Sequence, residues 1–183
     1  MSDTDVIIVG DGPGGLSAGL LLAKNGADVD VFGTDDTPMH KAMLYNYLGI
    51  REMTGSEFQR IARGQVEDFG GRLNEEKVDT VERTDGGFRV ETEEGDSYTA
   101  DYLVLATTNK AHQTQLGIDR TDDGVANVDR NGRTNIDHCY AIGWASRKDK
   151  IQAVISAGDG AAAAVDILSD QKGEPFHDFD VVE

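Results

Sequence analysis

The fold is decided by the stretch Asp5-Val-Ile-Ile-Val-Gly-Asp-Gly-Pro-Gly-Gly-Leu-Ser-Ala-Gly19. Its β-branched apolar run predicts a buried strand, which a glycine turn connects to an apolar helix. Gly10, Gly12 and Gly15 have the spacing G-x-G-x-x-G, in which the glycines permit a tight turn, the approach of a pyrophosphate and close packing of the helix. The stretch predicts a dinucleotide-related fold with the pyrophosphate at the helix N-terminus. The alternative is an α/β domain that keeps this turn but has lost its ligand.

The composition is strongly acidic. The chain has 34 Asp and Glu against 17 Lys and Arg, a formal charge of −17. Such a charge repels phosphates, which argues against nucleic acid and anionic membranes as partners. The acids are spread along the whole chain, and this pattern resembles the surfaces of proteins from salt-accumulating halophiles, where high ionic strength screens the repulsion. The alternative is an ordinary acidic cytosolic protein.

Cysteine and histidine usage limits the chemistry. Cys139 is the only cysteine, so an internal disulfide and a C-x-x-C redox pair are excluded, and a buried small apolar role is expected for it. The four histidines show no metal-ligand spacing, so no metal is predicted. The N-terminus lacks the basic start of a signal peptide, and no apolar run reaches the ~18 residues of a membrane span. We therefore expect a soluble, cytoplasmic protein.

The pattern along the chain indicates an α/β fold with a central parallel sheet. It predicts helices at 14–25, 54–69 and 152–168, and strands at 5–10, 27–32, 78–83, 87–93, 97–102, 102–107 and 139–143. The strands between 78 and 102 are expected to form a small antiparallel β meander. The connection 34–54 is long and rich in Met and aromatic residues, which predicts that it packs onto something. We expect one domain over 1–172 and a frayed tail over 173–183.

Several further motifs resemble the FAD-binding half of the thioredoxin reductase family. They are Leu44-Tyr-Asn-Tyr-Leu-Gly49, the strand Asp101-Tyr-Leu-Val-Leu-Ala-Thr107, the pair Asn131-Gly-Arg-Thr-Asn and Tyr140-Ala-Ile-Gly143, and the helix start Gln152-Ala-Val-Ile-Ser-Ala-Gly-Asp-Gly-Ala-Ala-Ala-Ala164. The last motif is the most specific. The resemblance covers nearly the whole chain and implies a Rossmann-like FAD-binding domain.

The resemblance also implies which residues bind FAD. Asn46 would lie by the ribityl chain, the backbone of 76–78 near adenine, and the helix start at Gln152 by the flavin pyrimidine ring. Many dinucleotide binders have a ribose-binding acid at the position of Gly33. A glycine in place of this acid is usual for thioredoxin reductases. The full set of expected cofactor-binding residues is Gly10, Gly12, Pro13, Gly14, Gly15, Gly33, Asn46, Val78, Ala106, Thr107, Gly143, Trp144, Gln152 and Ala153.

Three departures from the family pattern bear on activity. The family inserts a second, NADPH-binding domain after the Ala-Thr-Gly strand, whereas here only 109–115 precede the family's return segment at Leu116-Gly-Ile-Asp. Trp144 replaces the aspartate that binds a ribityl hydroxyl, and Thr108 replaces a glycine. Losing one charge-assisted hydrogen bond costs about 1.5–3 kcal/mol, which need not abolish FAD binding.

The sequence therefore predicts a thioredoxin-reductase-like flavoprotein that takes electrons from a separate, unidentified donor and cannot perform dithiol exchange. The alternative is a non-enzymatic flavin-binding or regulatory module that has lost reductase activity. Bound NAD(H) is a third option, which the absence of an acid at Gly33 disfavours. Candidate catalytic side chains are limited to His40, Lys41 and Tyr47, for which loop and packing roles are expected instead. A homodimer would cover the face that the missing domain leaves open.

Overall fold

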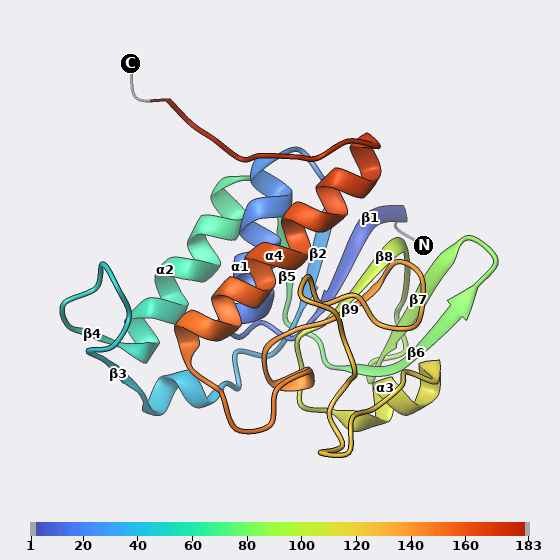
Figure 1. The fold of residues 1–183 in the computed structure, drawn as a ribbon, viewed down its shortest axis with the longest axis horizontal. Helices are drawn as coiled ribbons and strands as arrows, with labels where there is room; N and C mark the ends of the chain where they lie inside the picture. Colours follow the sequence, from blue (N-terminus) through green and yellow to red (C-terminus); the bar gives the residue numbers. More distant parts are fainter. Residues whose placement is uncertain (1–2, 182–183) are drawn as a thin grey trace.

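A computed structural model describes residues 3–181. Its centre is a seven-stranded sheet in the order β5–β2–β1–β8–β7–β6, with β9 also paired to β8 (Figure 1). The strands are β1 Asp3–Val9, β2 Val29–Phe32, β5 Arg72–Asn74, β6 Val78–Thr84, β7 Gly87–Thr92, β8 Ser97–Leu105 and β9 Cys139–Ala141. This is the α/β architecture that the sequence predicts.

Strand β8 joins the parallel and antiparallel parts of the sheet. It runs parallel to β1 along most of its length, and its end at Leu103–Leu105 pairs in parallel with β9. Its first residues pair antiparallel with β7, which in turn pairs with β6. The two strands predicted at 97–102 and 102–107 are therefore one continuous strand that serves both parts.

Three helices cover one face of the sheet. Figure 1 shows α1 (Pro13–Lys24), α2 (Gly55–Asp68) and α4 (Ala153–Lys172) side by side, with α1 in the middle. The alternation along β1 explains how both faces are buried: Val6 and Ile8 point into the core under these helices, whereas Ile7 and Val9 belong to the core on the other face. That second core is closed by the β6–β7 hairpin and by the segment after α3 (Lys110–Leu116).

The predicted connection 34–54 contains short elements. These are a 3-10 helix, η1 (Pro38–Lys41), and a two-stranded antiparallel sheet of β3 (Met43–Leu44) and β4 (Met53–Thr54). A second 3-10 helix, η2 (Gly143–Ala145), follows β9. Within residues 3–181, no helix combines the length and apolar character that crossing a bilayer requires.

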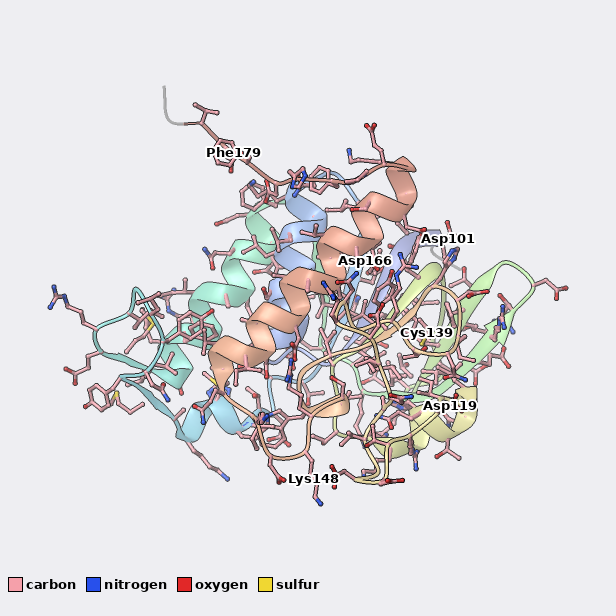
Figure 2. All side chains as sticks on the ribbon, viewed as in Figure 1. Asp101, Asp119, Cys139, Lys148, Asp166 and Phe179 are labelled. Carbon is pink, nitrogen blue, oxygen red and sulfur yellow. The ribbon has the colours of Figure 1, made fainter. Side chains whose placement is uncertain are left out.

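The structure differs from the sequence prediction at the C-terminal tail. The predicted helix end at 168 is extended by one turn to Lys172, and the chain then continues along the helical layer. Phe176 packs against the core under the helices, its backbone N–H donates to Ser169, and Asp178 forms an ion pair with Lys24 at 2.5 Å. Lys24 also forms an ion pair with Asp180 at 2.7 Å, so the tail is anchored as far as Asp180, whereas the side chain of Phe179 is exposed (Figure 2).

Candidate functional site

A cavity of about 500 Å³ opens where β1, β8 and β9 end. Its walls come from the glycine turn after β1, the η1–β3 segment, the turn after β8, and the start of α4. The predicted cofactor residues that line it are Gly10, Gly12, Pro13, Gly14, Asn46, Ala106, Thr107, Gly143, Trp144, Gln152 and Ala153. The sequence therefore identifies residues that are far apart in the chain but share one cavity.

The glycine turn places the N-terminus of α1 at this cavity. Gly10 has φ +112°, a left-handed conformation that favours glycine. A Cβ on Gly15 would overlap the carbonyl oxygen of Gly10, so the helix can approach the turn only without a side chain there. A Cβ on Gly12 would instead have a single neighbour, Thr37 Oγ1 at 3.7 Å, because this position faces the open cavity.

The N-terminus of α4 opens on the same cavity. Helices α1 and α4 approach so closely that a Cβ on Gly14 would lie 3.1 Å from the carbonyl oxygen of Ser156. Gln152 is the N-cap residue of α4, and its side-chain oxygen accepts a hydrogen bond from Asn46 Nδ2 at 2.9 Å. The two residues that the resemblance assigns to the ribityl and pyrimidine parts of the flavin thus contact each other across the chain.

These two helix N-termini are chemically alike and differ from those of the other α-helices in residues 3–181. The first turns of α2 and α3 are capped by the side chains of Thr54 and Asn109, whereas α1 and α4 have no side-chain cap and no acid in the first turn. Uncapped first-turn N–H groups and the helix dipole attract anionic or electron-rich groups. The residues lining the cavity include no Lys or Arg, so its donors for an anion are neutral: backbone N–H groups and uncharged polar side chains.

Three predicted cofactor residues do not line the cavity. Gly15 is in the first turn of α1 and packs on the carbonyl of Gly10, Gly33 lies behind the side chain of Asp11, and Val78 is buried in the core on the other face of the sheet. Conversely, several lining residues were not identified from the sequence: Asp11, Asp36, Thr37, Pro38, Met39, Ala42, Met43, Leu44, Ile142, Ile151 and Ser156. Most belong to 34–54, whose Met and aromatic content was the available signal.

Trp144 and Thr108, the two substitutions among the three departures from the family pattern, both line the cavity. Trp144 lies in η2 and is 40% exposed, so its ring is partly open to solvent at the site. The acid in this region is Asp159 of α4, whose carboxylate accepts hydrogen bonds from Arg147 at 2.6 and 2.7 Å and from the Gly143 N–H at 3.3 Å. That carboxylate is engaged within the protein and is not a lining group.

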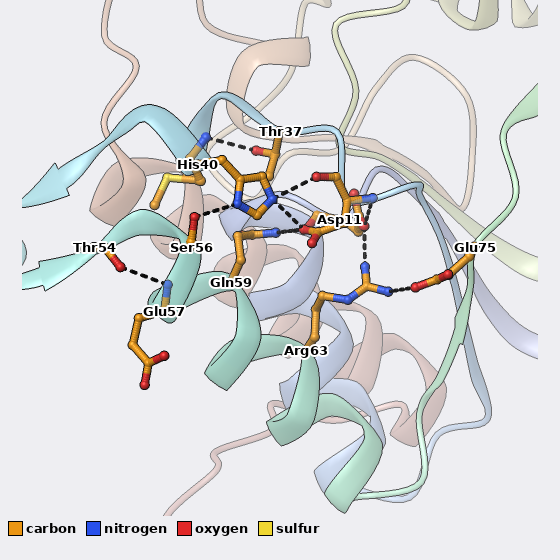
Figure 3. A network of polar contacts seen from close by, with 11 residues as sticks. Asp11, Thr37, His40, Thr54, Ser56, Glu57, Gln59, Arg63 and Glu75 are labelled. Carbon is orange, nitrogen blue, oxygen red and sulfur yellow. Dashed lines mark hydrogen bonds and ion pairs between the residues drawn. The ribbon is translucent and has the colours of Figure 1, made fainter.

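A polar network, which we call the Asp11 network, connects the glycine turn after β1, the segment after β2 and helix α2 (Figure 3). Asp11 itself lines the cavity. Asp11 Oδ2 accepts from the Asp35 N–H at 2.9 Å and from Arg63 Nη1 at 2.5 Å, and Arg63 also bonds Glu75. Gln59 Nε2 donates to the Asp11 carbonyl oxygen and to Asp35 Oδ1. The side chains of Asp11 and Arg63 are 8% and 14% exposed, so this ion pair is shielded from solvent.

The three candidate catalytic side chains lie outside the cavity lining. His40 hydrogen-bonds Ser56 Oγ and the Asp35 carbonyl oxygen, both at 2.9 Å. Tyr47 packs on Phe58, with ring centroids 5.5 Å apart, and Lys41 is exposed. Their contacts agree with the loop and packing roles expected from the sequence.

Cys139 lies in the core, on β9 (Figure 2). It is 1% exposed, and burial raises the pKa of its thiol to about 12. A thiol in this state has little nucleophilic thiolate at neutral pH. The single cysteine is therefore a packing residue, as its apolar surroundings in the sequence predict.

The comparisons with known proteins identify the family. Residues 4–107 and 43–161 match the model for pyridine nucleotide-disulphide oxidoreductases, and the chain belongs to this family. FAD is the cofactor of the family, as the sequence predicts. Among curated proteins, the chain is 28% identical over 180 residues to a dihydrolipoyl dehydrogenase of Haloferax volcanii. This alignment covers 93% of this chain and 34% of that protein. It is 29% identical over 175 residues to a thioredoxin reductase of Streptomyces clavuligerus, and this alignment covers 92% of this chain and 52% of that protein.

The chain thus spans about a third to a half of the length of these relatives. Solved structures show the same fold. A thioredoxin reductase from Gloeobacter violaceus superposes with a TM-score of 0.87 over 100% of both chains at 18% identity. An atypical thioredoxin reductase from Desulfovibrio vulgaris Hildenborough gives 0.84 over 94% of this chain and all of the other at 20% identity. The fold is therefore that of thioredoxin reductase structures.

Proposed function

We propose that this chain binds FAD in the described cavity and acts as a redox module that takes electrons from a separate donor. The observation that supports this proposal most strongly is the pair of uncapped helix N-termini, α1 and α4, that open on one cavity. An extended cofactor with an anionic pyrophosphate and a pyrimidine ring that carries carbonyl acceptors matches such donors at two separated points. The family match supplies the identity of that cofactor.

Each group of lining residues has a task in this proposal. The first-turn N–H groups of α1, next to Gly12 and Gly14, would bind the pyrophosphate. Asn46 would bind the ribityl chain once its bond to Gln152 is exchanged, and the start of α4 would face the pyrimidine ring. When bound, FAD supplies a reducible ring system that accepts and releases electron pairs.

The residues near the cavity restrict how electrons can leave. No thiol or imidazole is among the residues that line it, and Cys139 is buried in the core. Dithiol exchange therefore needs cysteines that these 183 residues do not contain. The protein's part in the reaction is to bind the cofactor, orient it and leave one side open to an external donor or acceptor.

Trp144 makes the proposal directly measurable. It is the only tryptophan in the chain and it lines the cavity, so bound FAD is expected to quench its emission. The recombinant protein in high salt is expected to be yellow and to release FAD when denatured. A colourless protein whose Trp144 emission does not respond to added FAD would overturn the proposal.

A second candidate function is a flavin-binding module without enzymatic activity. It is favoured by the cavity lining, in which the only titratable side chains are Asp11 and Asp36. Steady-state turnover with NADH, NADPH and artificial acceptors separates the two candidates. Bound flavin that stays oxidised with each donor tried, but is reduced by dithionite, would favour the binding module.

We further propose that the chain works in the cytoplasm at high salt and that a homodimer covers the face that the missing second domain leaves open. Exposed apolar side chains are available for such a contact: Met43 and Val154 are 45% and 40% exposed, and Leu48 of the β3–β4 loop is 95% exposed. Sedimentation at molar salt tests the dimer. A monomer at high protein concentration would contradict it.

A further inference from the structure

Position 33 cannot carry the ribose-binding acid that dinucleotide-binding folds place at the end of the second strand. A Cβ built on Gly33 would lie 2.7 Å from Asp11 Cβ and would overlap the carboxyl group of that residue. The carboxyl of Asp11, which belongs to the turn after β1, thus occupies the space into which a side chain at 33 would project. The end of β2 has its acid, but a different part of the chain supplies it.

The protein fixes this carboxyl in place. Two donors, the Asp35 N–H and Arg63 Nη1, converge on its Oδ2 atom, and Gln59 holds the Asp11 carbonyl oxygen at 3.0 Å (Figure 3). The Arg63 guanidinium is itself held by Glu75 at 3.0 Å. A carboxylate with one oxygen fixed by two donors has a defined direction for its other oxygen.

That other oxygen, Oδ1, is free to accept. It has no hydrogen-bond partner among residues 3–181. It is also not one of the fully buried side-chain oxygens without a partner in these residues, which belong to Gln59, Glu76 and Gln113. The unpaired Oδ1 therefore retains access to solvent. Asp11 lines the cavity next to Asp36 and Thr37, at the end where β2 stops.

We propose that Asp11 is the ribose-recognition residue of this chain: its Oδ1 accepts hydrogen bonds from the adenosine ribose hydroxyls of FAD, and Arg63 positions it. This inference rests on the proposed FAD site and deepens it. It accounts for an acid inside the glycine turn, where a negative charge close to a pyrophosphate is otherwise unfavourable. The ion pair with Arg63 compensates that charge.

The test compares two probes that differ only in the ribose hydroxyls, ADP and 2′,3′-dideoxy-ADP, by competition with FAD at high salt. The wild-type protein is expected to prefer ADP by roughly tenfold to a hundredfold, the range for a hydrogen bond to a charged group. Asp11→Asn, which keeps the shape of the side chain but loses its charge, is expected to reduce this preference at least several-fold.

Asp35→Asn is the matched control. Asp35 belongs to the same network but not to the cavity lining, and asparagine tolerates its φ of +54°. The control is expected to keep the preference for ADP. Equal loss of the preference in both variants would overturn the proposal, because it would assign the effect to the network as a whole, and so would an unchanged preference in Asp11→Asn.

The wild-type protein alone also tests the proposal if Asp11→Asn does not fold. Equal affinity for ADP and its dideoxy analogue would overturn it without any variant. Failure of the proposed function has a different signature, since the wild-type protein would then take up no FAD at all. A protein that binds FAD without discriminating the two probes leaves the FAD site standing and removes the role of Asp11.

Discussion

The substitutions Gly12→Ala and Gly15→Ala add the same methyl group to the same turn, and the structure predicts opposite consequences. At Gly15 the new Cβ would overlap the Gly10 carbonyl oxygen and lie 3.0 Å from the carbonyl carbon and 3.3 Å from Ala106 Cβ. Two of these atoms are backbone and cannot rotate away, so α1 must move off the turn. Overpacking of this kind costs about 1–3 kcal/mol or more.

At Gly12 the methyl group meets only Thr37 Oγ1, at 3.7 Å. The backbone there has φ −74° and ψ −175°, an extended conformation that alanine adopts readily. Replacing glycine by alanine lowers the conformational entropy of the unfolded chain, which stabilises the protein, whereas alanine is a poorer N-cap residue than glycine, which destabilises it. The two effects nearly cancel, so the free energy of unfolding should change by less than about 0.5 kcal/mol. The methyl group does, however, occupy cavity space next to the α1 N-terminus.

Two assays separate these effects. Thermal unfolding of the FAD-free proteins is expected to show a Tm for Gly15→Ala lower by roughly 2–12 °C, at 2–4 °C per kcal/mol for a chain of this size. The Tm of Gly12→Ala should match the wild type, whereas its FAD affinity, measured by quenching of Trp144, should fall about tenfold to a hundredfold, the equivalent of 1–3 kcal/mol. A Gly12→Ala protein that binds FAD as tightly as the wild type would refute the placement of the pyrophosphate, and one as unstable as Gly15→Ala would refute the steric reasoning.

Three further predictions concern the salt dependence of FAD binding, the carboxylate of Asp166 and the thiol of Cys139. FAD affinity should rise with salt, because the chain has a charge of −17 and no Lys or Arg lines the cavity. The Debye length, over which the chain repels the anionic cofactor, falls from about 10 Å at 0.1 M salt to about 3 Å at 1 M. An affinity that falls over this range in a fluorescence titration would contradict this prediction. Asp166→Ala should lower the free energy of unfolding by about 1.5–3 kcal/mol in denaturant titrations, because Asp166 accepts hydrogen bonds from Asn131, Arg133 and the buried Tyr140 hydroxyl. Burial raises the pKa of the Cys139 thiol to about 12. The stability that the neutral thiol contributes is complete below the pKa of about 8.5 in the unfolded chain and is lost as pH rises toward 12. The native protein at pH 8 should therefore not react with a thiol reagent, and rapid labelling before unfolding would contradict this.

The sequence predicts the elements whose residues are determined locally. The apolar run of β1 and the glycines after it leave little choice of conformation, and the small residues at the start of α4 predict its close packing. Strand β5 was missed because it has only three residues and its pairing depends on a distant partner. Arg72 forms a bidentate ion pair with the buried Asp30 of β2, at 2.8 and 2.7 Å, which no periodicity reports.

Helix α3 was missed for a related reason. It has seven residues, and those it buries are polar, His112 and Gln113. Burial lowers the pKa of His112, which keeps the imidazole neutral in the core. The candidate site shows the same limit: the sequence directs attention to position 33 for a ribose-binding acid, whereas tertiary packing brings the carboxyl of Asp11 to that point. Only the folded chain shows that the two positions share one space.

The connection between β8 and β9 explains how this fold stands without the second domain that the resemblance places there. The two strands pair directly, and the segment between them returns to the sheet instead of leaving it. Gln113 Nε2 donates to the Ala145 carbonyl oxygen at 3.1 Å, and Gln115 Oε1 accepts from the Val81 N–H at 3.1 Å. Because these bonds tie α3 to both η2 and β6, the segment is part of the packed domain and does not form a pair of linkers. The segment between β8 and β9 is therefore too closely packed to hold an inserted domain, and a reductant for a flavin in this cavity would not come from that position.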